Sequence, residues 1–229
     1  MELGGNAPFI VCDDADLDAA IDGAMTAKMR HSAETCTAAN RFYAQSGIAQ
    51  DFTDGLAKAM AAVKVGNGTD PDVGCGPMID AKAVDRLAGL VKAAQDDGAR
   101  VVTGGSAIDG PGHFFETTVL AEVDHASEIC HQEIFGPVAP VATFAEIDAV
   151  IAQANDTEMG LTGYVYTKDL AKGLAISERI QAGMIGLNRG LVSDPASPFG
   201  GMKQSGLGRE GSTEGIYEFC ETQYIATDW

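Results

Sequence analysis

The sequence predicts an α/β protein with a mainly parallel sheet flanked by helices. Strand-like apolar runs alternate with helical patterns along its 229 residues, and this alternation is typical of parallel strands joined by crossover helices. Apolar residues make up 45% of the chain, which is enough to fill the core of such a fold. Because no long linker interrupts the pattern, we expect one domain over residues 1–229.

Short apolar runs mark the candidate strands. Runs of this length are typical of strands buried in a sheet. They lie at Ala7–Val11, Arg41–Ala44, Arg100–Thr103, Val138–Thr143, Thr162–Tyr166 and Met184–Leu187. A weak alternation of apolar and polar residues at Phe219–Ile225 predicts a further strand at the C-terminus.

Helical patterns occupy the segments between these strands. The stretch at 13–16 contains three aspartates, which favour a helix N-terminus directly after it through capping and the helix dipole. Near the middle of the chain, Gly98 follows a run of apolar residues at helical spacing and is placed to end that helix. The predicted helices are Leu17–Arg30, Ile48–Val63, Ala81–Asp97, Ile147–Ala154 and Leu170–Ile180.

The charge and the hydropathy of the chain exclude several classes of partner. The formal net charge is −18, and binding to nucleic acid or to anionic membranes needs clustered Lys and Arg. No apolar run approaches the roughly 20 residues that a bilayer span needs, and no basic segment followed by an apolar one opens the chain. We therefore expect a cytoplasmic protein that binds neither nucleic acid nor membrane.

The cysteines and histidines predict neither disulfides nor a metal site. The five cysteines are odd in number and widely spaced, without a Cys-x-x-Cys pair, which is typical of reduced thiols. The four histidines show no metal-ligand spacing with them. These residues are Cys12, Cys36, Cys75, Cys130, Cys220, His31, His113, His125 and His131.

Cys36 differs in setting from a structural cysteine. It lies in a polar stretch just ahead of a predicted strand, within the run Glu34–Phe42. A cysteine in a polar loop can expose a reactive thiolate, whereas a structural one usually lies within an apolar run. The alternative is a small buried side chain, which is the usual state of a free cysteine. The local sequence leaves both interpretations open.

Three other motifs accompany the Cys36 run in a fixed order: Glu2–Asn6, His131–Pro137 and Pro198–Glu210. Together they resemble the aldehyde dehydrogenase superfamily, from Glu2 to about Tyr224, and most closely its succinate-semialdehyde dehydrogenases. The resemblance implies the catalytic domain of that fold. It also implies that the dinucleotide-binding domain, and the asparagine that completes the oxyanion hole, lie outside this chain.

The resemblance assigns catalytic roles to Cys36 and Glu2. The Cys36 thiolate would attack the aldehyde carbonyl, the thiohemiacetal would lose a hydride, and water would cleave the resulting thioester. Glu2 matches the general base, which activates the thiol or the water. Since Glu2 is the second residue and chain termini usually fray, we expect it to be poorly held in this chain.

Glu133 and Phe135 match the residues that hold the nicotinamide ribose and the adjacent ring of NAD or NADP. A carboxylate can accept hydrogen bonds from ribose hydroxyls, and an aromatic edge can position a planar ring. The alternative is a capping Glu and a core Phe. His131-Gln132 departs from the Arg-Glu that more often precedes this glutamate.

Arg30 and Ser193 match the positions at which succinate-semialdehyde dehydrogenases bind the substrate carboxylate, and Arg suits bidentate carboxylate recognition. An arginine at a helix end can equally serve the helix dipole. Many relatives carry a second cysteine two residues after the nucleophile, where this chain has Ala38. A redox disulfide at that position is therefore impossible.

The function expected from the resemblance is NAD(P)-dependent oxidation of an aldehyde, succinate semialdehyde in particular, by a longer parent protein. The chain alone is expected to be inactive and to bind no nucleotide cofactor. Its tail Phe219–Ile225 predicts a homo-oligomer, because in relatives this strand pairs with a neighbouring subunit. Two alternatives remain, a cofactor-free thiol esterase using Cys36 and a non-catalytic assembly module.

Overall fold

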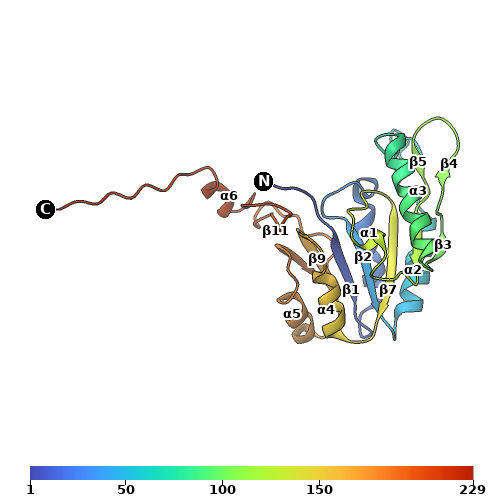
Figure 1. Cartoon of the computed structure of the whole chain (residues 1–229), viewed down its shortest axis with the longest axis horizontal. Helices are drawn as coiled ribbons and strands as arrows, with labels where there is room; N and C mark the ends of the chain where they lie inside the picture. The colour runs from blue at the N-terminus through green and yellow to red at the C-terminus, as the bar shows by residue number, and fades with distance from the viewer. Residues whose placement is uncertain (229) are drawn as a thin grey trace.

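A seven-stranded sheet forms the centre of the molecule, for which a computed structural model describes residues 1–228 (Figure 1). Its strand order is β10-β9-β1-β2-β7-β6-β3, and every neighbouring pair is parallel except β3 with β6. The predicted α/β class with a mainly parallel sheet is thus confirmed. The strands are β1 (Ala7–Val11), β2 (Ala39–Gln45), β3 (Arg100–Thr103), β6 (Thr118–Ala121), β7 (Val138–Phe144), β9 (Thr162–Tyr166) and β10 (Met184–Leu187).

All six internal strands expected from the sequence are present, together with β6, which the sequence did not predict. That strand is buried along its four residues, but it is short and follows a turn-rich segment. Two further pairs of two-residue strands lie outside the main sheet. They are β4 (Ala107–Ile108) with β5 (Phe114–Phe115), and β8 (Met159–Gly160) with β11 (Met202–Lys203).

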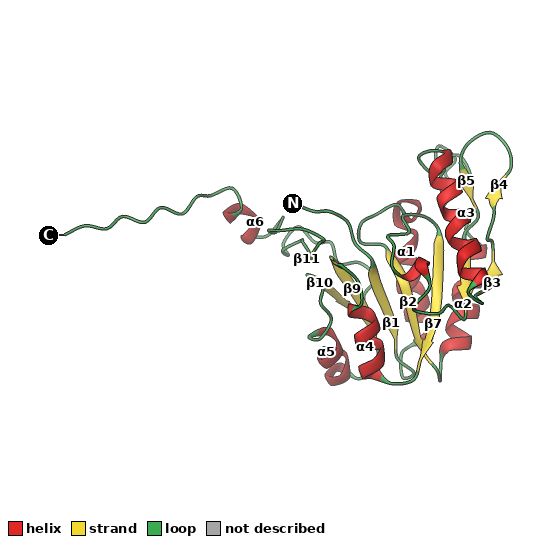
Figure 2. Cartoon of the chain, in the orientation of Figure 1, coloured by secondary structure: helices red, strands yellow, loops and turns green. Residues whose placement is uncertain are grey.

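Helices cover both faces of the sheet (Figure 2). Helices α1 (Leu17–Met29) and α2 (Ala49–Ala61) pack on the face that contains Phe9 and Val11. The other face, which contains Ile10, is covered by α4 and α5, and α3 packs on the same side near β6. The bounds of the remaining helices are α3 (Ala81–Asp96), α4 (Ile147–Asn155), α5 (Leu170–Ser177), α6 (Glu214–Tyr217) and the 3-10 helices η1 (Arg30–Ala33) and η2 (Glu128–Cys130).

The chain leaves α1 through a strained turn that leads to Cys36. Helix α1 ends at Met29, one residue before the predicted end. His31, Ser32 and Ala33 then have φ values of 49°, 60° and 66°, which L-residues adopt infrequently. The Ser32 Oγ supports the turn by accepting a hydrogen bond of 2.7 Å from the N–H of Gly76.

The N-terminal residues lie against the Gly-rich segment near the other end of the sequence. The N–H of Leu3 donates to the carbonyl oxygen of Ser205 at 2.9 Å, and the N–H of Leu207 donates to that of Met1 at 3.1 Å. Glu2 forms an antiparallel bridge with Gly206 between these bonds. The expectation of a frayed Glu2 is therefore wrong, because backbone hydrogen bonds from a distant loop hold the residue.

The C-terminal segment beyond α6 runs away from the body (Figure 1). Residues 221–228 carry no helix or strand, so the strand predicted at Phe219–Ile225 is not found in this chain. A strand needs hydrogen-bonding partners, and no sheet edge formed by residues 1–228 reaches this segment. Phe219 and Tyr224 are 93% and 87% exposed. None of the described helices is long and apolar enough to cross a membrane.

Candidate active site

Cys36 lies in a tight turn between η1 and β2. The N–H of Ala38 closes this turn by donating to the carbonyl oxygen of Thr35 at 3.0 Å. The buried Tyr164 of β9 donates its hydroxyl proton to the carbonyl oxygen of Thr37 at 2.8 Å. Gly5 packs directly on the turn, since a Cβ there would lie 2.7 Å from the carbonyl oxygen of Cys36. Two neighbouring strands of the sheet therefore fix the position of the thiol.

The Cys36 thiol is half-buried and faces the Glu2 carboxylate. Burial raises the pKa of Cys36 to about 11, with further increases from the charge of Glu2 and from the hydrogen bond between the two groups. At neutral pH the protonated thiol therefore predominates over the thiolate. The local sequence left open whether Cys36 is an exposed thiolate or a buried side chain, and the structure shows a half-buried thiol whose pKa is raised by burial and by the adjacent Glu2 carboxylate.

The Gly4-Gly5 pair brings Glu133 into the same site. The N–H of Gly4 donates to Glu2 Oε1 at 3.3 Å, and the N–H of Gly5 donates to Glu133 Oε1 at 3.1 Å. Burial raises the pKa of Glu133, the Glu2 charge raises it further, and the Gly5 hydrogen bond opposes both. The structure thus places Glu2, Cys36 and Glu133 around one glycine pair.

Phe135 belongs to the surface rather than the core. It is 39% exposed, so the alternative of a core Phe is wrong. Its φ of 45° is unusual for an aromatic residue, and Arg86 of α3 holds the preceding backbone by donating to the carbonyl oxygens of Glu133 and Ile134 at 3.2 and 2.5 Å. Within residues 1–228, Glu133 Oε2 accepts no hydrogen bond. A carboxylate oxygen open to hydroxyl donors and, two residues later, an exposed aromatic ring fit a ribose and its attached ring.

Arg30 lies on the Cys36 side of the sheet. Burial raises the pKa of Tyr164 to about 12, and the charges of Arg30 and Cys36 act on that hydroxyl in opposite directions. Both charges therefore act at Tyr164, whose hydroxyl contacts the Cys36 turn at Thr37. Among the described residues Arg30 has no ion-pair partner, so its guanidinium is available to an anion.

Ser193 is not joined to Arg30 by any contact that the structure shows. It lies in the loop after β10, half-buried and without a hydrogen bond in the described part of the chain. Its neighbour Val192 packs against the core. A Cβ on Gly190 would lie 2.2 Å from the carbonyl oxygen of Gly23, so this loop lies along α1, the helix that leads to Arg30.

Three positioning residues were missed by the sequence analysis: Tyr164, Arg86 and Ser205. The Oγ of the fully buried Ser205 accepts a hydrogen bond from the N–H of Gly160 at 2.9 Å, which anchors the Gly-rich segment beside Glu2. That segment holds the N-terminal residues and has no helix N-terminus to serve as a phosphate site. No local pattern marks Tyr164 or Arg86, and although Ser205 lies in the Pro198–Glu210 motif, its contact with Gly160 does not follow from that motif, because all three residues act on segments far away in the sequence.

The Cys36 turn, the adjacent carboxylates and the doubly covered parallel sheet agree with the family resemblance. Residues 1–225 match the aldehyde dehydrogenase family along nearly the whole chain. The chain belongs to this family.

Individual members of the aldehyde dehydrogenase family are close in sequence and in structure. A succinate-semialdehyde dehydrogenase of Paenarthrobacter nicotinovorans is 55% identical over 98% of this chain and 50% of that protein. A succinate-semialdehyde dehydrogenase [NADP(+)] of Escherichia coli K12 is 46% identical over 98% and 47%. The crystal structure of aldehyde dehydrogenase from Brucella melitensis biovar abortus 2308 has a TM-score of 0.95 at 50% identity, over 98% of this chain and 46% of that one. The chain thus spans about half the length of the relatives it matches.

Proposed function

We propose that this chain forms the catalytic domain of an NAD(P)-dependent aldehyde dehydrogenase that oxidises succinate semialdehyde to succinate. The observation that carries the proposal is the Glu2 carboxylate at the half-buried Cys36 thiol. A thiol with a raised pKa needs a nearby base to become a nucleophile, and Glu2 is placed to act as that base.

The Cys36 thiol and the Glu2 carboxylate together account for the steps of the oxidation. Glu2 accepts the thiol proton as Cys36 Sγ bonds to the aldehyde carbon, and the carbonyl electron pair moves to oxygen. Collapse of this thiohemiacetal expels a hydride and leaves a thioester. Glu2 releases the first proton to solvent and can then accept a proton from the water that attacks the thioester. The carbon–sulfur bond breaks, Glu2 returns this second proton to the Cys36 sulfur, and the product leaves as a carboxylate after its acid proton passes to solvent.

Glu133 and Phe135 are the residues that would hold the nicotinamide end of the cofactor. Bound NAD or NADP supplies the hydride acceptor. The open Oε2 of Glu133 and the exposed Phe135 ring support this role. Since these two residues reach only one end of a dinucleotide, we expect calorimetric titration of this chain with NAD or NADP to be flat through the low millimolar range.

The carboxylate end of the substrate is assigned to Arg30, with Ser193 as a second contact. The guanidinium has no internal anionic partner and lies near Tyr164, on the side of the nucleophile. Bidentate hydrogen bonds from Arg to a carboxylate are strong and directional. The names of the two relatives above support a semialdehyde that carries a terminal acid.

Acylation by an activated ester tests the nucleophile and the base in this chain. Intact-mass spectrometry should show one acyl group, located on Cys36, which Cys36→Ser abolishes. Glu2→Gln should retain the acyl group longer, because it removes the base that activates water. Acylation at another cysteine would contradict the assignment. Fast ester turnover by the unmodified chain without nucleotide would instead support the thiol esterase.

A homo-oligomer formed through the C-terminal segment completes the proposal. Apolar side chains of this segment are almost fully exposed, among them Phe219, Tyr224 and Ile225. Extended chains with unpaired backbone groups add readily to the edge of another sheet. Light scattering should therefore show an assembly. A monomer at micromolar concentration would contradict this part.

A further inference from the structure

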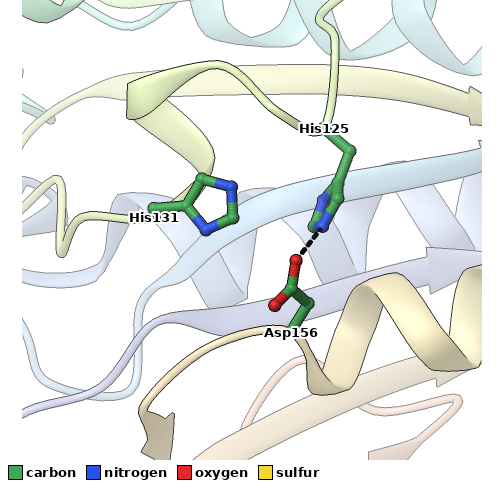
Figure 3. Close-up of side chains that lie close together, drawn as sticks. All are labelled: His125, His131 and Asp156. Carbon is green, nitrogen blue, oxygen red and sulfur yellow. Dashed lines mark hydrogen bonds and ion pairs between the residues drawn. The ribbon is translucent and has the colours of Figure 1, made fainter.

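Three potential metal ligands meet on the surface opposite the α1–α2 layer, although they come from separate segments. His125 follows β6, His131 follows η2, and Asp156 ends α4. One nitrogen or oxygen atom from each residue lies within 4.8 Å of the others. His125 Nε2 and Asp156 Oδ2 are 3.0 Å apart, and the two imidazole rings are 5.2 Å apart between centroids (Figure 3).

We propose that His125, His131 and Asp156 form a binding site for Zn²⁺ or a similar divalent transition-metal ion. Two imidazoles and one carboxylate are a donor set that zinc uses, with bonds of about 2.0–2.2 Å. Two donors on one tetrahedral zinc are then about 3.3 Å apart. His125 and Asp156 already have nearly this spacing, so only His131, which is exposed, has to rotate toward them. The proposal does not depend on the dehydrogenase activity.

A buried tyrosine orients the first of these ligands. Tyr43 of β2 is fully buried, and its hydroxyl lies 3.0 Å from Nδ1 of His125. The second ring nitrogen, Nε2, is thereby aimed at Asp156. Histidine ligands of metals almost always hydrogen-bond through the nitrogen that does not bind the metal. In the metal-bound form, Nδ1–H would donate to the Tyr43 oxygen and leave the Nε2 lone pair for the ion.

An adjoining cavity supplies access and room for a water ligand. Its volume is about 530 Å³, and it is lined by His131 and Asp156 together with Asn6, Glu133, Thr157 and Met159, among others. A site with three protein ligands keeps one position of a tetrahedral ion open. That position can face this cavity.

Two nearby cations limit the affinity. Lys203 Nζ donates to the carbonyl oxygens of Asn155 and Thr157 at 2.8 Å, on either side of Asp156 in the sequence. The buried Arg41 donates to backbone carbonyl oxygens, including that of Ala154 at 2.9 Å. Positive charge beside the backbone that carries Asp156 opposes a divalent ion at this ligand. We therefore expect weaker binding than at a zinc site without such neighbours.

Calorimetric titration of the metal-free chain with zinc chloride tests the site. The chain would carry Cys36→Ser and Cys220→Ser, because exposed and half-buried thiols also bind zinc. His131→Gln is the main variant, since the His131 side chain makes no hydrogen bond within residues 1–228. Asp156→Asn is the second variant, because it can keep the hydrogen bond to His125. His113→Gln, in the loop before β5, is the matched control.

One zinc per chain should bind, and each of the two ligand variants should weaken binding roughly tenfold or more, while His113→Gln changes it less than about twofold. Cobalt in place of zinc should give the visible absorption of a tetrahedral site, and His131→Gln should remove it. Circular dichroism would confirm that the variants are folded. No binding at millimolar zinc, or equal affinity in both ligand variants and the control, would overturn the proposal.

Discussion

The two ends of this chain differ in how they are attached to the fold: the N-terminal residues are hydrogen-bonded to it, whereas the C-terminal segment extends away from it. Residues 1–3 are held by backbone hydrogen bonds to residues 205–207, and this places Glu2 at Cys36. Both ends expose large apolar side chains, Met1 and Leu3 at the first and Phe219, Tyr224 and Ile225 at the second, yet the segment after Tyr217 runs away from the rest of the fold. Apolar content therefore did not decide which end is fixed. Paired backbone groups within the same chain did.

This difference has a functional side. The held end supplies a carboxylate to the half-buried Cys36 thiol, where an error of position is costly. The free end exposes Phe219, Tyr224 and Ile225, and apolar surface of this kind is stabilised when another chain covers it. We expect the N-terminal residues to serve catalysis and the C-terminal segment to serve subunit assembly. The following substitutions and the truncation test these two roles separately.

The largest effect is expected from Glu2→Gln. Loss of a general base costs about 10²- to 10⁴-fold in turnover, so kcat of the complete dehydrogenase should fall by that amount with little change in the melting temperature. Glu221→Gln, in the exposed tail, is the matched control and should leave kcat unchanged. Equal losses in both variants would show that position 2 has no special role.

Alkylation of Cys36 should depend steeply on pH. Its thiol has a pKa raised to about 11, and below the pKa the reactive thiolate increases about tenfold for each pH unit. In a Cys220→Ser background, the rate with iodoacetamide should therefore rise roughly a hundredfold from pH 7 to pH 9. Glu2→Gln should move this profile to lower pH, because it removes a negative charge beside the thiol. A plateau already at pH 7 would show a preformed thiolate.

Arg30→Ala tests whether the site around Cys36 also binds the carboxylate of the substrate. A charge-assisted contact of this kind is worth roughly tenfold to a hundredfold in kcat/KM. The complete enzyme should lose that much with succinate semialdehyde, mainly through KM, and much less with an uncharged aldehyde of similar length. Equal losses with the two aldehydes would mean that Arg30 only stabilises the fold.

Gly206→Ala tests the backbone pairing that holds residues 1–3 against residues 205–207. Gly206 has a φ of 130°, and an added Cβ would lie 2.1 Å from the carbonyl oxygen of Met1, so the Ala variant must displace the N-terminal segment that carries Glu2. We expect kcat to fall about tenfold, since misplacement of roughly 1 Å can cost up to a hundredfold. Gly68→Ala, whose added Cβ meets nothing within 4 Å, is the control. Unchanged activity in the Gly206 variant would show that catalysis does not need the pairing of residues 1–3 with residues 205–207.

Truncation after Glu218 should have the smallest effect on the site. The removed segment is exposed and carries no helix or strand, so the alkylation rate of Cys36 should change less than about twofold. The apparent mass in light scattering should fall to that of a monomer. An unchanged assembly would place the subunit contact elsewhere, and a large change in alkylation would show that the tail supports the site.

The sequence by itself determined the order of the elements and the chemistry available to them. The runs at Ala7–Val11, Thr162–Tyr166 and Met184–Leu187 coincide with strands, because buried parallel strands are continuous apolar segments that local composition reveals. The motifs around Cys36 and Glu133 identified the family for the same reason, since each is a local pattern. β6 was missed although it is as long as β10, because it directly follows a turn-rich segment that hides its apolar residues.

Only the tertiary structure decided how those residues act. Cys36 has a raised pKa rather than an exposed thiolate because burial and Glu2 act on it through space. Glu2 is held because a loop about 200 residues later lies beside it. His125 and His131 meet Asp156 although no metal-ligand spacing joins them in the sequence. Desolvation, charge and coordination depend on distances in space, and those distances arise only when the sheet brings separate segments together.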